Sequence, residues 1–328
     1  MLSPNGGKAV VLVADDDPYV QKALSLLLSE QGYQVVVASD GREAQDRLRE
    51  TPADLCVLDY DMPGVNGMNL CRQIKADPAT CLLPVVMLTG VAPEQEKLNA
   101  LDAGVDEFLT KPVDPAALLA KIRSLLRIKA LTDELEDAEV VLFTLARTIE
   151  AKDPYTMGHA DRVARFGVLL GRAMGFGPDK LEMLRKGGIL HDIGKLGVPD
   201  AILQKQGPLD AREWEAMRRH PMMGCEICQR LKGMKEILPI IRHHHERLNG
   251  TGYPDGLKGP QIPDVVRVIN LVDIYDALTS QRAYKEAFPP VKAFRVMRDE
   301  VERGWWDGDL LKVWEDLVQR GVVAEGRV

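Results

Sequence analysis

The sequence lacks the features that mark membrane, secreted and nucleic-acid-binding proteins. In 328 residues no run of 18 uninterrupted apolar residues occurs, and the first residues do not have the layout of a signal peptide. The five cysteines are an odd number without framework spacing, and neither half of the chain has the basic charge of a nucleic-acid-binding domain. We therefore expect a cytoplasmic protein in a reducing compartment that binds neither DNA nor membranes.

Histidine is absent from the first 158 residues, and all six histidines lie between His159 and His245. Charge is also uneven, because residues 1–127 carry 12 Lys and Arg against 18 Asp and Glu, whereas the remainder carries 30 against 31. The length is typical of two domains that each bury a core. We expect an acidic domain at residues 1–127 and a histidine-containing domain at 153–328, joined by residues 128–152.

Residues 1–127 alternate short apolar runs with amphipathic segments. The expected strands are Val10–Ala14, Val35–Ala38, Leu55–Leu58, Val85–Thr89 and Glu107–Thr110. Helices are expected near residues 18–31, 41–50, 66–76, 93–103 and 114–127. Five such units predict a doubly wound α/β domain with a five-stranded parallel sheet, whose ligands bind at the carboxyl ends of the strands.

Acidic residues collect at those strand ends. Asp15 and Asp16 follow the first strand and Asp59 follows the third, while Thr89 ends the fourth and Lys111 follows the fifth. Three carboxylates with a lysine predict a site for a hard, oxygen-ligated ion such as Mg²⁺. Asp59 is then placed to attack a phosphoryl donor as a carboxylate nucleophile.

This half resembles the receiver domain of two-component response regulators, which is flavodoxin-like, over nearly all of residues 8–127. The matching motifs are Val-Leu-Val-Ala-Asp15-Asp16-Asp17-Pro, Leu58-Asp59-Tyr-Asp-Met62-Pro63, Leu88-Thr89-Gly90 and Thr110-Lys111-Pro112. The resemblance implies that Asp59 is the phosphoacceptor and that Asp15, Asp16 and Asp59 hold Mg²⁺. It implies that Thr89 and Lys111 contact the phosphoryl group, that Phe108 is the rotating aromatic of the switch, and that the Lys111–Pro112 peptide is cis. A sensor histidine kinase is the implied partner.

The segment that follows contains no Gly, Pro or Ser from Ile128 to Glu150, so we expect a helix instead of a flexible linker. Its apolar residues alternate at steps of three and four: Ile128, Leu131, Leu135, Ala138, Leu142, Leu145 and Ile149. Two alternatives stay open. The stripe is either the seam of a parallel homodimer, through which phosphorylation shifts packing, or one face of an amphipathic helix that packs on its own domain.

Residues 153–328 show helical periodicity without a strand pattern. Helices are expected at Asp161–Met174, Asp179–Leu190, Arg212–Arg219, Gly224–Leu231, Glu236–His244, Val265–Leu278 and Pro290–Glu302. This pattern predicts an all-α helical bundle that holds metal ions between its helices. A Gly- and Pro-rich loop from Asn249 to Pro263 interrupts it. Tyr253 on this loop is either a contact point or lid, or it packs the loop's own turn.

The stretch His191-Asp192-Ile-Gly-Lys195 pairs a histidine with an aspartate and returns a lysine to the same side. Adjacent helical residues point about 100° apart, so His191 and Asp192 can serve two ions only if the carboxylate bridges them. Imidazole with carboxylate suits Fe, Mn, Zn or Ni better than Mg or Ca. The HExxH motif of zinc peptidases is absent.

This second half resembles the HD-GYP phosphodiesterases, over about residues 140–320, and a receiver followed by such a domain is a known response-regulator arrangement. The matching motifs are His191-Asp192-Ile-Gly-Lys195, His244-His245-Glu246-Arg247, Gly252-Tyr253-Pro254 and Asp273-x-x-Asp276-Ala-Leu-Thr-Ser. The resemblance implies an HD-domain fold and hydrolysis of cyclic di-GMP at a two- or three-metal centre. The implied ligands are His159, His191, Asp192, His220, His244, His245 and Asp273. Lys195 is the motif lysine near the metals, and Arg282 and Lys285 match positions that grip substrate phosphates.

Three positions depart from the family pattern. Asn249 replaces the usual Asp before the loop, Ala283 replaces a Pro, and Tyr155 stands where members with a third metal carry Glu. Tyrosine offers hard divalent ions a weak oxygen, so two metals per chain and a linear pGpG product are expected. His243 has no ligand role in the pattern and is expected to support the ligands.

The leading prediction is a cyclic di-GMP phosphodiesterase controlled by phosphorylation of Asp59. Two divalent ions, with iron or manganese expected ahead of zinc, nickel or cobalt, attract a phosphodiester, and metal-bound water reaches a pKa of about 7. Two alternatives stay open. One is a catalytically weak receptor or scaffold that binds the nucleotide or a diguanylate cyclase (GGDEF) protein through Gly252-Tyr253-Pro254, and the other is a phosphohydrolase of linear nucleotides.

Overall fold

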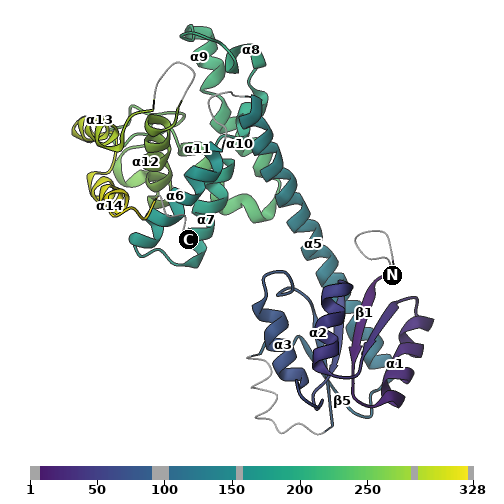
Figure 1. Cartoon of the computed structure of the whole chain (residues 1–328). Coiled ribbons are helices and arrows are strands. Elements are labelled where there is room, and N and C mark those ends of the chain that lie inside the picture. Colours follow the sequence, from purple (N-terminus) through teal and green to yellow (C-terminus); the bar gives the residue numbers. More distant parts are fainter. Residues whose placement is uncertain (1–7, 91–102, 153–157, 282–286, 324–328) are drawn as a thin grey trace. The chain divides into compact units, whose positions relative to one another are not determined.

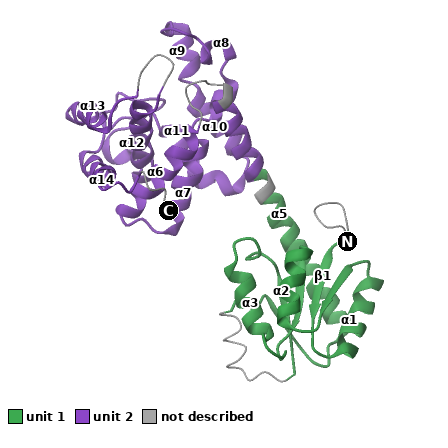
Figure 2. Ribbon diagram, in the orientation of Figure 1, with its two compact units in different colours: residues 1–138 green, residues 139–328 purple. Residues whose placement is uncertain are grey.

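The structure, a computed structural model, describes residues 8–90, 103–152, 158–281 and 287–323. It divides into two compact units, Met1–Ala138 and Glu139–Val328, which Figure 2 colours separately. The helix predicted at 93–103 lies, except for its last residue, outside the described residues.

Unit 1 contains a five-stranded parallel sheet in the order β2-β1-β3-β4-β5. Its strands are β1 (Val10–Ala14), β2 (Gln34–Ala38), β3 (Leu55–Asp59), β4 (Val85–Thr89) and β5 (Glu107–Thr110). The predicted sheet is confirmed, and each predicted strand agrees with the observed bounds to within one residue. The strand order reverses between β1 and β3, so the crevice where such sheets bind ligands opens beside Asp15 and Asp59.

Helices cover both faces of this sheet (Figure 1): α1 (Pro18–Glu30), α2 (Gly41–Glu50), α3 (Gly67–Ala76) and the beginning of α5 (Pro115–Lys152). Successive strand residues point to opposite faces. Leu12 and Leu58 therefore join a core under α2 and α3, whereas Val13 joins a second core with Leu28 of α1 and Leu118 of α5. Apolar clusters therefore lie on both faces of the sheet.

Helix α5 runs without interruption from Pro115 to Lys152. The predicted helix at 114–127 and the predicted connecting helix at 128–152 are therefore one element, whose first part belongs to unit 1 and whose last part belongs to unit 2. No glycine or proline after Pro115 interrupts this helix, so nothing in its sequence breaks it between the two units.

The apolar stripe predicted along α5 is not exposed over its whole length. Leu142 and Ile149 are only 8% and 4% exposed, because they pack within unit 2. Ile128, Leu131 and Leu135 are 58%, 53% and 60% exposed. The C-terminal half of the stripe thus packs on its own domain, which was the second alternative. For the N-terminal half of the stripe both alternatives remain, a homodimer seam and packing on its own domain.

The described residues of unit 2 form helices and loops without a β-strand, as predicted. Its helices are α6 (His159–Ala173), α7 (Pro178–Leu190), α8 (Asp200–Leu203), α9 (Ala211–Met217), α10 (His220–Cys228), α11 (Leu238–His243), α12 (Asp264–Thr279), α13 (Pro290–Glu302) and α14 (Gly308–Gln319). Short 3₁₀ turns are η1 (Ile193–Gly197), η2 (Lys232–Ile237) and η3 (Gly259–Gln261). The predicted helix Glu236–His244 begins later, because Pro239 fits only in the first turn of α11.

Two apolar clusters hold unit 2 together. In the larger one Phe166 of α6, Tyr275 of α12 and Trp314 of α14 pack with ring centroids 5.2 to 6.1 Å apart. In the smaller one Leu142 and Ile149 of α5 contribute to the same buried cluster as residues of α6, α7 and η1. None of the helices described in either unit is both long and apolar enough to cross a membrane.

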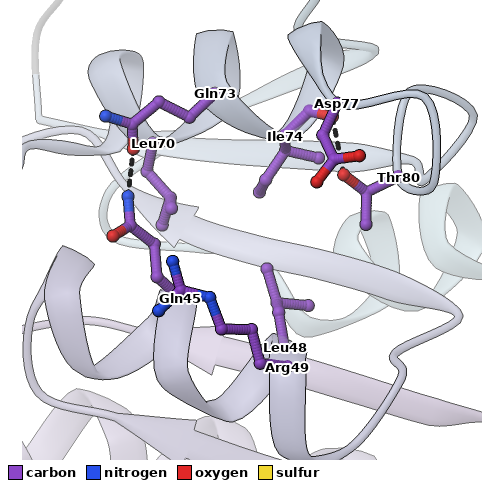
Figure 3. A pocket seen from close by; sticks show the side chains of 8 residues that line it. All are labelled: Gln45, Leu48, Arg49, Leu70, Gln73, Ile74, Asp77 and Thr80. Atoms are coloured by element: carbon purple, nitrogen blue, oxygen red, sulfur yellow. Dashed lines mark hydrogen bonds between the residues drawn. The ribbon is translucent and has the colours of Figure 1, made fainter.

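A pocket of about 360 Å³ lies between α2 and α3 of unit 1 (Figure 3). Leu48, Leu70 and Ile74 form its apolar lining, and a hydrogen bond joins Gln45 to Gln73 across it. The residues around it do not include the acidic strand ends, so we assign it no part in the predicted chemistry.

Candidate metal centre

Helix α7 delivers the His191-Asp192 pair at its C-terminal end. The helix ends at Leu190, and Asp192 is the N-cap residue of the turn η1. The turn packs closely on α10, since a Cβ atom at Gly194 would lie 1.8 Å from the carbonyl oxygen of His220. Only glycine permits this approach, so Gly194 brings the His-Asp pair against His220.

Three of the histidines are oriented by the backbone immediately before them in the chain. In each, Nδ1 faces the backbone carbonyl three residues earlier: His191 with Gly188 at 2.8 Å, His220 with Met217 at 2.7 Å, and His244 with Ile241 at 2.9 Å. A ring nitrogen that faces a carbonyl carries the proton, so Nε2 is left to bind a metal.

Six of the seven predicted ligands fall into two groups whose ligand atoms lie within 4.8 Å of one another. The groups are Asp192, His220, His244 and His245, and His159, His191 and Asp192. Asp192 belongs to both. Its Oδ1 lies 3.2 Å from His220 Nε2 and 3.7 Å from His244 Nε2, whereas its Oδ2 lies 3.4 Å from His191 Nε2. One oxygen faces each group, which is the arrangement expected of a bridging carboxylate.

Lys195 returns to this carboxylate as predicted, with Nζ 2.7 Å from Asp192 Oδ2. Burial raises the pKa of Asp192, but Lys195 and His191 outweigh burial and hold the pKa well below its usual range. Asp192 is therefore ionised and available to a cation.

His159 opens helix α6 and connects the second group to helix α12. Its Nε2 lies 3.2 Å from Asp273 Oδ1, and its Nδ1 lies 2.7 Å from Asp276 Oδ2. Arg162 holds Asp276 in a bidentate ion pair at 2.6 and 3.0 Å. Burial lowers the pKa of His159, but the hydrogen bonds with Asp273 and Asp276 outweigh it and raise the pKa to about 9.

The orienting role of Asp276 was not predicted. Its signal in the sequence is the spacing Asp273-x-x-Asp276, which puts both carboxylates on one face of α12. Asp273 faces Nε2 of His159 and Asp276 faces Nδ1 of the same ring, so Asp276 fixes the orientation of His159.

The donor set fits divalent metal ions. Within the described part of the chain, the buried Nε2 of His191 has no hydrogen-bond partner, and the Nε2 atoms of His220 and His244 face each other at 3.0 Å. Burial lowers the pKa of His244 to about 4 and that of His245 well below its usual value, so both rings are neutral. Neutral imidazoles with two carboxylates favour iron, manganese, zinc or nickel.

The Gly252-Tyr253-Pro254 loop is tied to the centre through Glu246. The buried carboxylate of Glu246 accepts hydrogen bonds from the backbone N–H groups of Asp255, Gly256 and Leu257, at 2.7, 2.9 and 3.1 Å. The centroid of the Tyr253 ring lies 4.7 Å from that of His245, and the Arg218 guanidinium lies over the Tyr253 ring at 5.3 Å from its centroid. The loop therefore borders the candidate metal centre.

His243 and Asn249 serve the loop and not the ligands. His243 Nε2 lies 2.9 Å from Asp255 Oδ2, which Arg242 also binds. This contact supports the loop, whereas His243 was expected to support the ligands. Asn249 accepts the N–H of Thr251 at 3.0 Å and donates to the carbonyl of Arg303. An amide suits this position because it donates as well as accepts.

Four positions singled out in the sequence lie outside the described residues: Tyr155, Arg282, Ala283 and Lys285. The predicted grip of Arg282 and Lys285 on substrate phosphates therefore stays a prediction.

The strand ends of unit 1 form a second, oxygen-only site. The carboxylates of Asp15, Asp16 and Asp59 have ligand atoms within 4.8 Å of one another. Lys111 Nζ lies 2.7 Å from Asp15 and 2.9 Å from Asp59. Burial raises the pKa of Asp59, and the hydrogen bond from Lys111 opposes this.

The two other residues expected at this site lie on the neighbouring strands. Thr89 is buried at the end of β4, Phe108 is partly buried in β5, and the Lys111–Pro112 peptide is cis as expected. The residues predicted at the strand ends therefore lie at the carboxyl edge of the sheet: Asp15, Asp16, Asp59, Thr89 and Lys111.

Two family models match the chain. The response regulator receiver domain matches residues 11–123, and the HD domain matches residues 144–310. The cyclic di-GMP phosphodiesterase response regulator RpfG of Xanthomonas campestris is 35% identical over 259 residues, which cover 72% of this chain and 68% of that protein. A cyclic di-GMP phosphodiesterase of Thermotoga maritima is 31% identical over 313 residues, 87% of this chain and 84% of that protein.

A third relative matches about half of the chain. The 3'3'-cGAMP-specific phosphodiesterase 3 of Vibrio cholerae is 40% identical over 169 residues, which cover 51% of this chain and 37% of that protein. Together with the two longer matches, the order of receiver and HD domains places the chain in one family. The chain belongs to the response regulators that join a receiver domain to an HD domain, the family of the cyclic di-GMP phosphodiesterase response regulators.

Proposed function

We propose that this protein hydrolyses cyclic di-GMP to linear pGpG at a two-metal centre and that phosphorylation of Asp59 controls the rate. The observation that carries the proposal is the pair of ligand groups that share Asp192, with one carboxylate oxygen facing each group. The names of the relatives that span both domains support cyclic di-GMP as the substrate.

The ligands in this proposal are His159, His191, Asp192, His220, His244, His245 and Asp273. When bound there, two divalent ions act as Lewis acids that polarise a phosphodiester and activate water. Iron or manganese is the expected metal, with zinc, nickel or cobalt as alternatives.

The protein's own groups hold this arrangement. Lys195 fixes the bridging carboxylate, Asp276 fixes the ring of His159, and Glu246 fixes the loop that carries Tyr253. Tyr253 lies against His245 and offers a ring on which a guanine base can stack. Arg282 and Lys285 bind the substrate phosphates in this proposal.

In the proposed reaction water cleaves one of the two phosphodiester bonds, which leaves a 5'-phosphate and a free 3'-hydroxyl. Rebinding of pGpG brings an additional phosphate charge, and a third metal would offset it. Tyr155 stands where a third-metal ligand would be, so pGpG should accumulate. Replacement Tyr155→Glu should then raise the metal content from two to three and accelerate GMP release, as chromatography of a time course would measure. Equal rates of GMP release by wild type and Tyr155→Glu would show that Tyr155 does not limit the hydrolysis of pGpG.

The direct test of the function uses purified full-length protein loaded with Mn²⁺ or Fe²⁺ under anaerobic conditions. Cyclic di-GMP should yield pGpG, and Asp192→Ala should not. The higher identity of the 3'3'-cGAMP-specific relative makes that dinucleotide the second candidate substrate. A larger kcat/KM for 3'3'-cGAMP would reassign the substrate, and metal binding with no turnover of either would favour a receptor or scaffold that binds diguanylate cyclases.

The proposal includes a sensor histidine kinase as phosphodonor and a homodimer formed through Ile128, Leu131 and Leu135. These apolar side chains recur at helical spacing and are more than half exposed. Leu131→Lys with Leu135→Lys should lower the mass measured by light scattering from dimer to monomer, because paired seam positions are desolvated. A wild-type monomer, with and without phosphorylation, would eliminate the dimer.

A further inference from the structure

Glu150 lies in the last turn of helix α5 and its side chain reaches the start of helix α6. Its Oε2 accepts a hydrogen bond from the N–H of Gly158 at 3.1 Å, and its Oε1 accepts one from the N–H of Ala160. Glu150 is 9% exposed. The N–H groups of a first helical turn have no partner within their own helix, so a carboxylate from another helix supplies the acceptor here.

Helix α6 depends on this outside acceptor. Its N-cap residue is Gly158, which provides no side-chain hydrogen bond to the first turn. A negative charge at a helix N-terminus is also stabilised by the helix dipole. Glu150 therefore caps α6 in place of a local Ser, Thr, Asp or Asn.

The two amides that Glu150 holds are those immediately before and after His159. The ring of His159 is held separately, with Nδ1 at 2.7 Å from Asp276 and Nε2 at 3.2 Å from Asp273. The backbone of this ligand is thus anchored to α5, and its ring is anchored to α12. A displacement of Glu150 would move the His159 backbone relative to the ring's partners.

The same part of α5 also packs against the His-Asp motif. Leu142 and Ile149 belong to the buried cluster that contains Leu190 and Ile193, the residues on either side of His191-Asp192. Helix α5 is continuous from Pro115, three residues beyond the Lys111–Pro112 peptide of the receiver unit. Helix α5 is therefore continuous with the chain of the receiver unit and contacts both ligand-bearing segments through hydrogen bonds and apolar packing.

We propose that Glu150 is a positioning residue through which helix α5 sets the placement of His159, and that the phosphorylation state of the receiver reaches the metal centre by this contact. The transmission of phosphorylation rests on the proposed function, whereas the positioning of His159 by Glu150 does not. Glu150 acts through the backbone of His159 and does not contact the substrate.

Two variants and one matched control test it. Glu150→Ala removes both acceptors, and Glu150→Gln keeps the size and one oxygen acceptor but removes the charge. Arg147→Gln is the control, because Arg147 makes an exposed ion pair from α5 to Asp161 of α6 at 3.0 Å, one turn from Glu150. The control therefore disrupts an α5–α6 contact that does not hold the backbone of His159.

The first readout is Mn²⁺ affinity of the full chain, measured by equilibrium dialysis without substrate and with excess Mg²⁺ to occupy the receiver site. Glu150→Ala should weaken the binding of one of two ions by about tenfold or more, in the range for loss of a group that supports a ligand. Glu150→Gln should fall between that variant and wild type, and Arg147→Gln should match wild type. Wild-type affinity in both Glu150 variants would overturn the positioning role, whatever the substrate.

The second readout is the ratio of cyclic di-GMP turnover with and without beryllium fluoride and Mg²⁺, which mimic phosphorylated Asp59. The ratio should move toward one in both Glu150 variants, with a lower kcat and little change in KM, and should stay at the wild-type value in Arg147→Gln. A ratio of one in wild type, or an equal loss in Arg147→Gln, would overturn transmission through Glu150. Absence of wild-type turnover would refute the proposed function and leave the dialysis result to decide the positioning role.

Discussion

The two candidate sites of this protein both contain carboxylates, but they differ in the groups that surround them. In the receiver unit the partners of Asp15 and Asp59 are oxygens and the ammonium group of Lys111. In the HD unit the carboxylates of Asp192 and Asp273 lie among imidazole nitrogens. The first set suits a hard ion that exchanges readily, and the second suits a transition metal that stays bound.

The balance of charge within each site also differs. Burial raises the pKa of Asp59, and Lys111 only opposes this rise. At Asp192 burial is outweighed by Lys195 and His191, so the pKa is lowered. The receiver carboxylate is thus left with an unfavourable environment that a cation or a phosphoryl group can relieve. The HD carboxylate is already stabilised as an anion by its fixed neighbours.

The replacement with the largest expected effect is Asp192→Ala. It removes the one group shared by both ligand sets, so turnover should fall by more than the roughly 100-fold that loss of a supporting group costs. Metal content of the HD unit should fall with it, whereas labelling of Asp59 by a small phosphodonor should not change. Asp179→Ala is the matched control, since it removes an exposed carboxylate from the first turn of α7, the helix that precedes Asp192. Full activity in Asp192→Ala would reject the metal centre as described.

The converse replacement is Asp59→Asn in the receiver site. Labelling with a small phosphodonor and Mg²⁺ should be lost, and the phosphodonor should no longer change the rate of cyclic di-GMP hydrolysis. Transition-metal content should equal that of wild type, because the two sites have separate ligands. Asp61→Asn is a suitable control, because Asp61 is exposed and two residues away. Labelling of Asp59→Asn at the wild-type level would refute the receiver assignment.

A smaller effect is expected from Glu246→Gln, which tests whether the loop belongs to the metal centre. The amide cannot accept at both positions, so at least one of the N–H groups of Asp255, Gly256 and Leu257 loses its acceptor. Hydrogen bonds to a charged group contribute about 1.5–3 kcal/mol, so the free energy of unfolding measured with urea should fall by an amount of that order. Metal content should be retained while KM for the substrate rises. A variant with unchanged KM would separate the loop from substrate binding.

Much of the fold could be predicted because the sequence signals are local. The strands of unit 1 are short apolar runs, and the strand-end positions of Asp15, Asp59 and Lys111 follow from parallel topology alone. Helix α14 was not predicted, although Leu310, Leu311 and Trp314 recur at helical spacing and Asp307 caps its start.

Other features depend on tertiary contacts that no local pattern carries. The stripe on α5 is regular, but unit 2 covers Leu142 and Ile149 while Leu135 stays exposed. Periodicity shows that a face is apolar and does not show what covers it. Glu150 was missed for the same reason, because its partners are the amides of Gly158 and Ala160 on the next helix.

The most direct test of the central claim is a titration of metal-free, full-length protein with Mn²⁺ or Fe²⁺ under anaerobic conditions while cyclic di-GMP hydrolysis is followed. Two ligand groups that share Asp192 predict that activity rises to a plateau at two ions per chain, with pGpG as product, and that Mg²⁺ alone does not restore it. A plateau at one ion, or equal hydrolysis with Mg²⁺ alone, would contradict the two-metal centre.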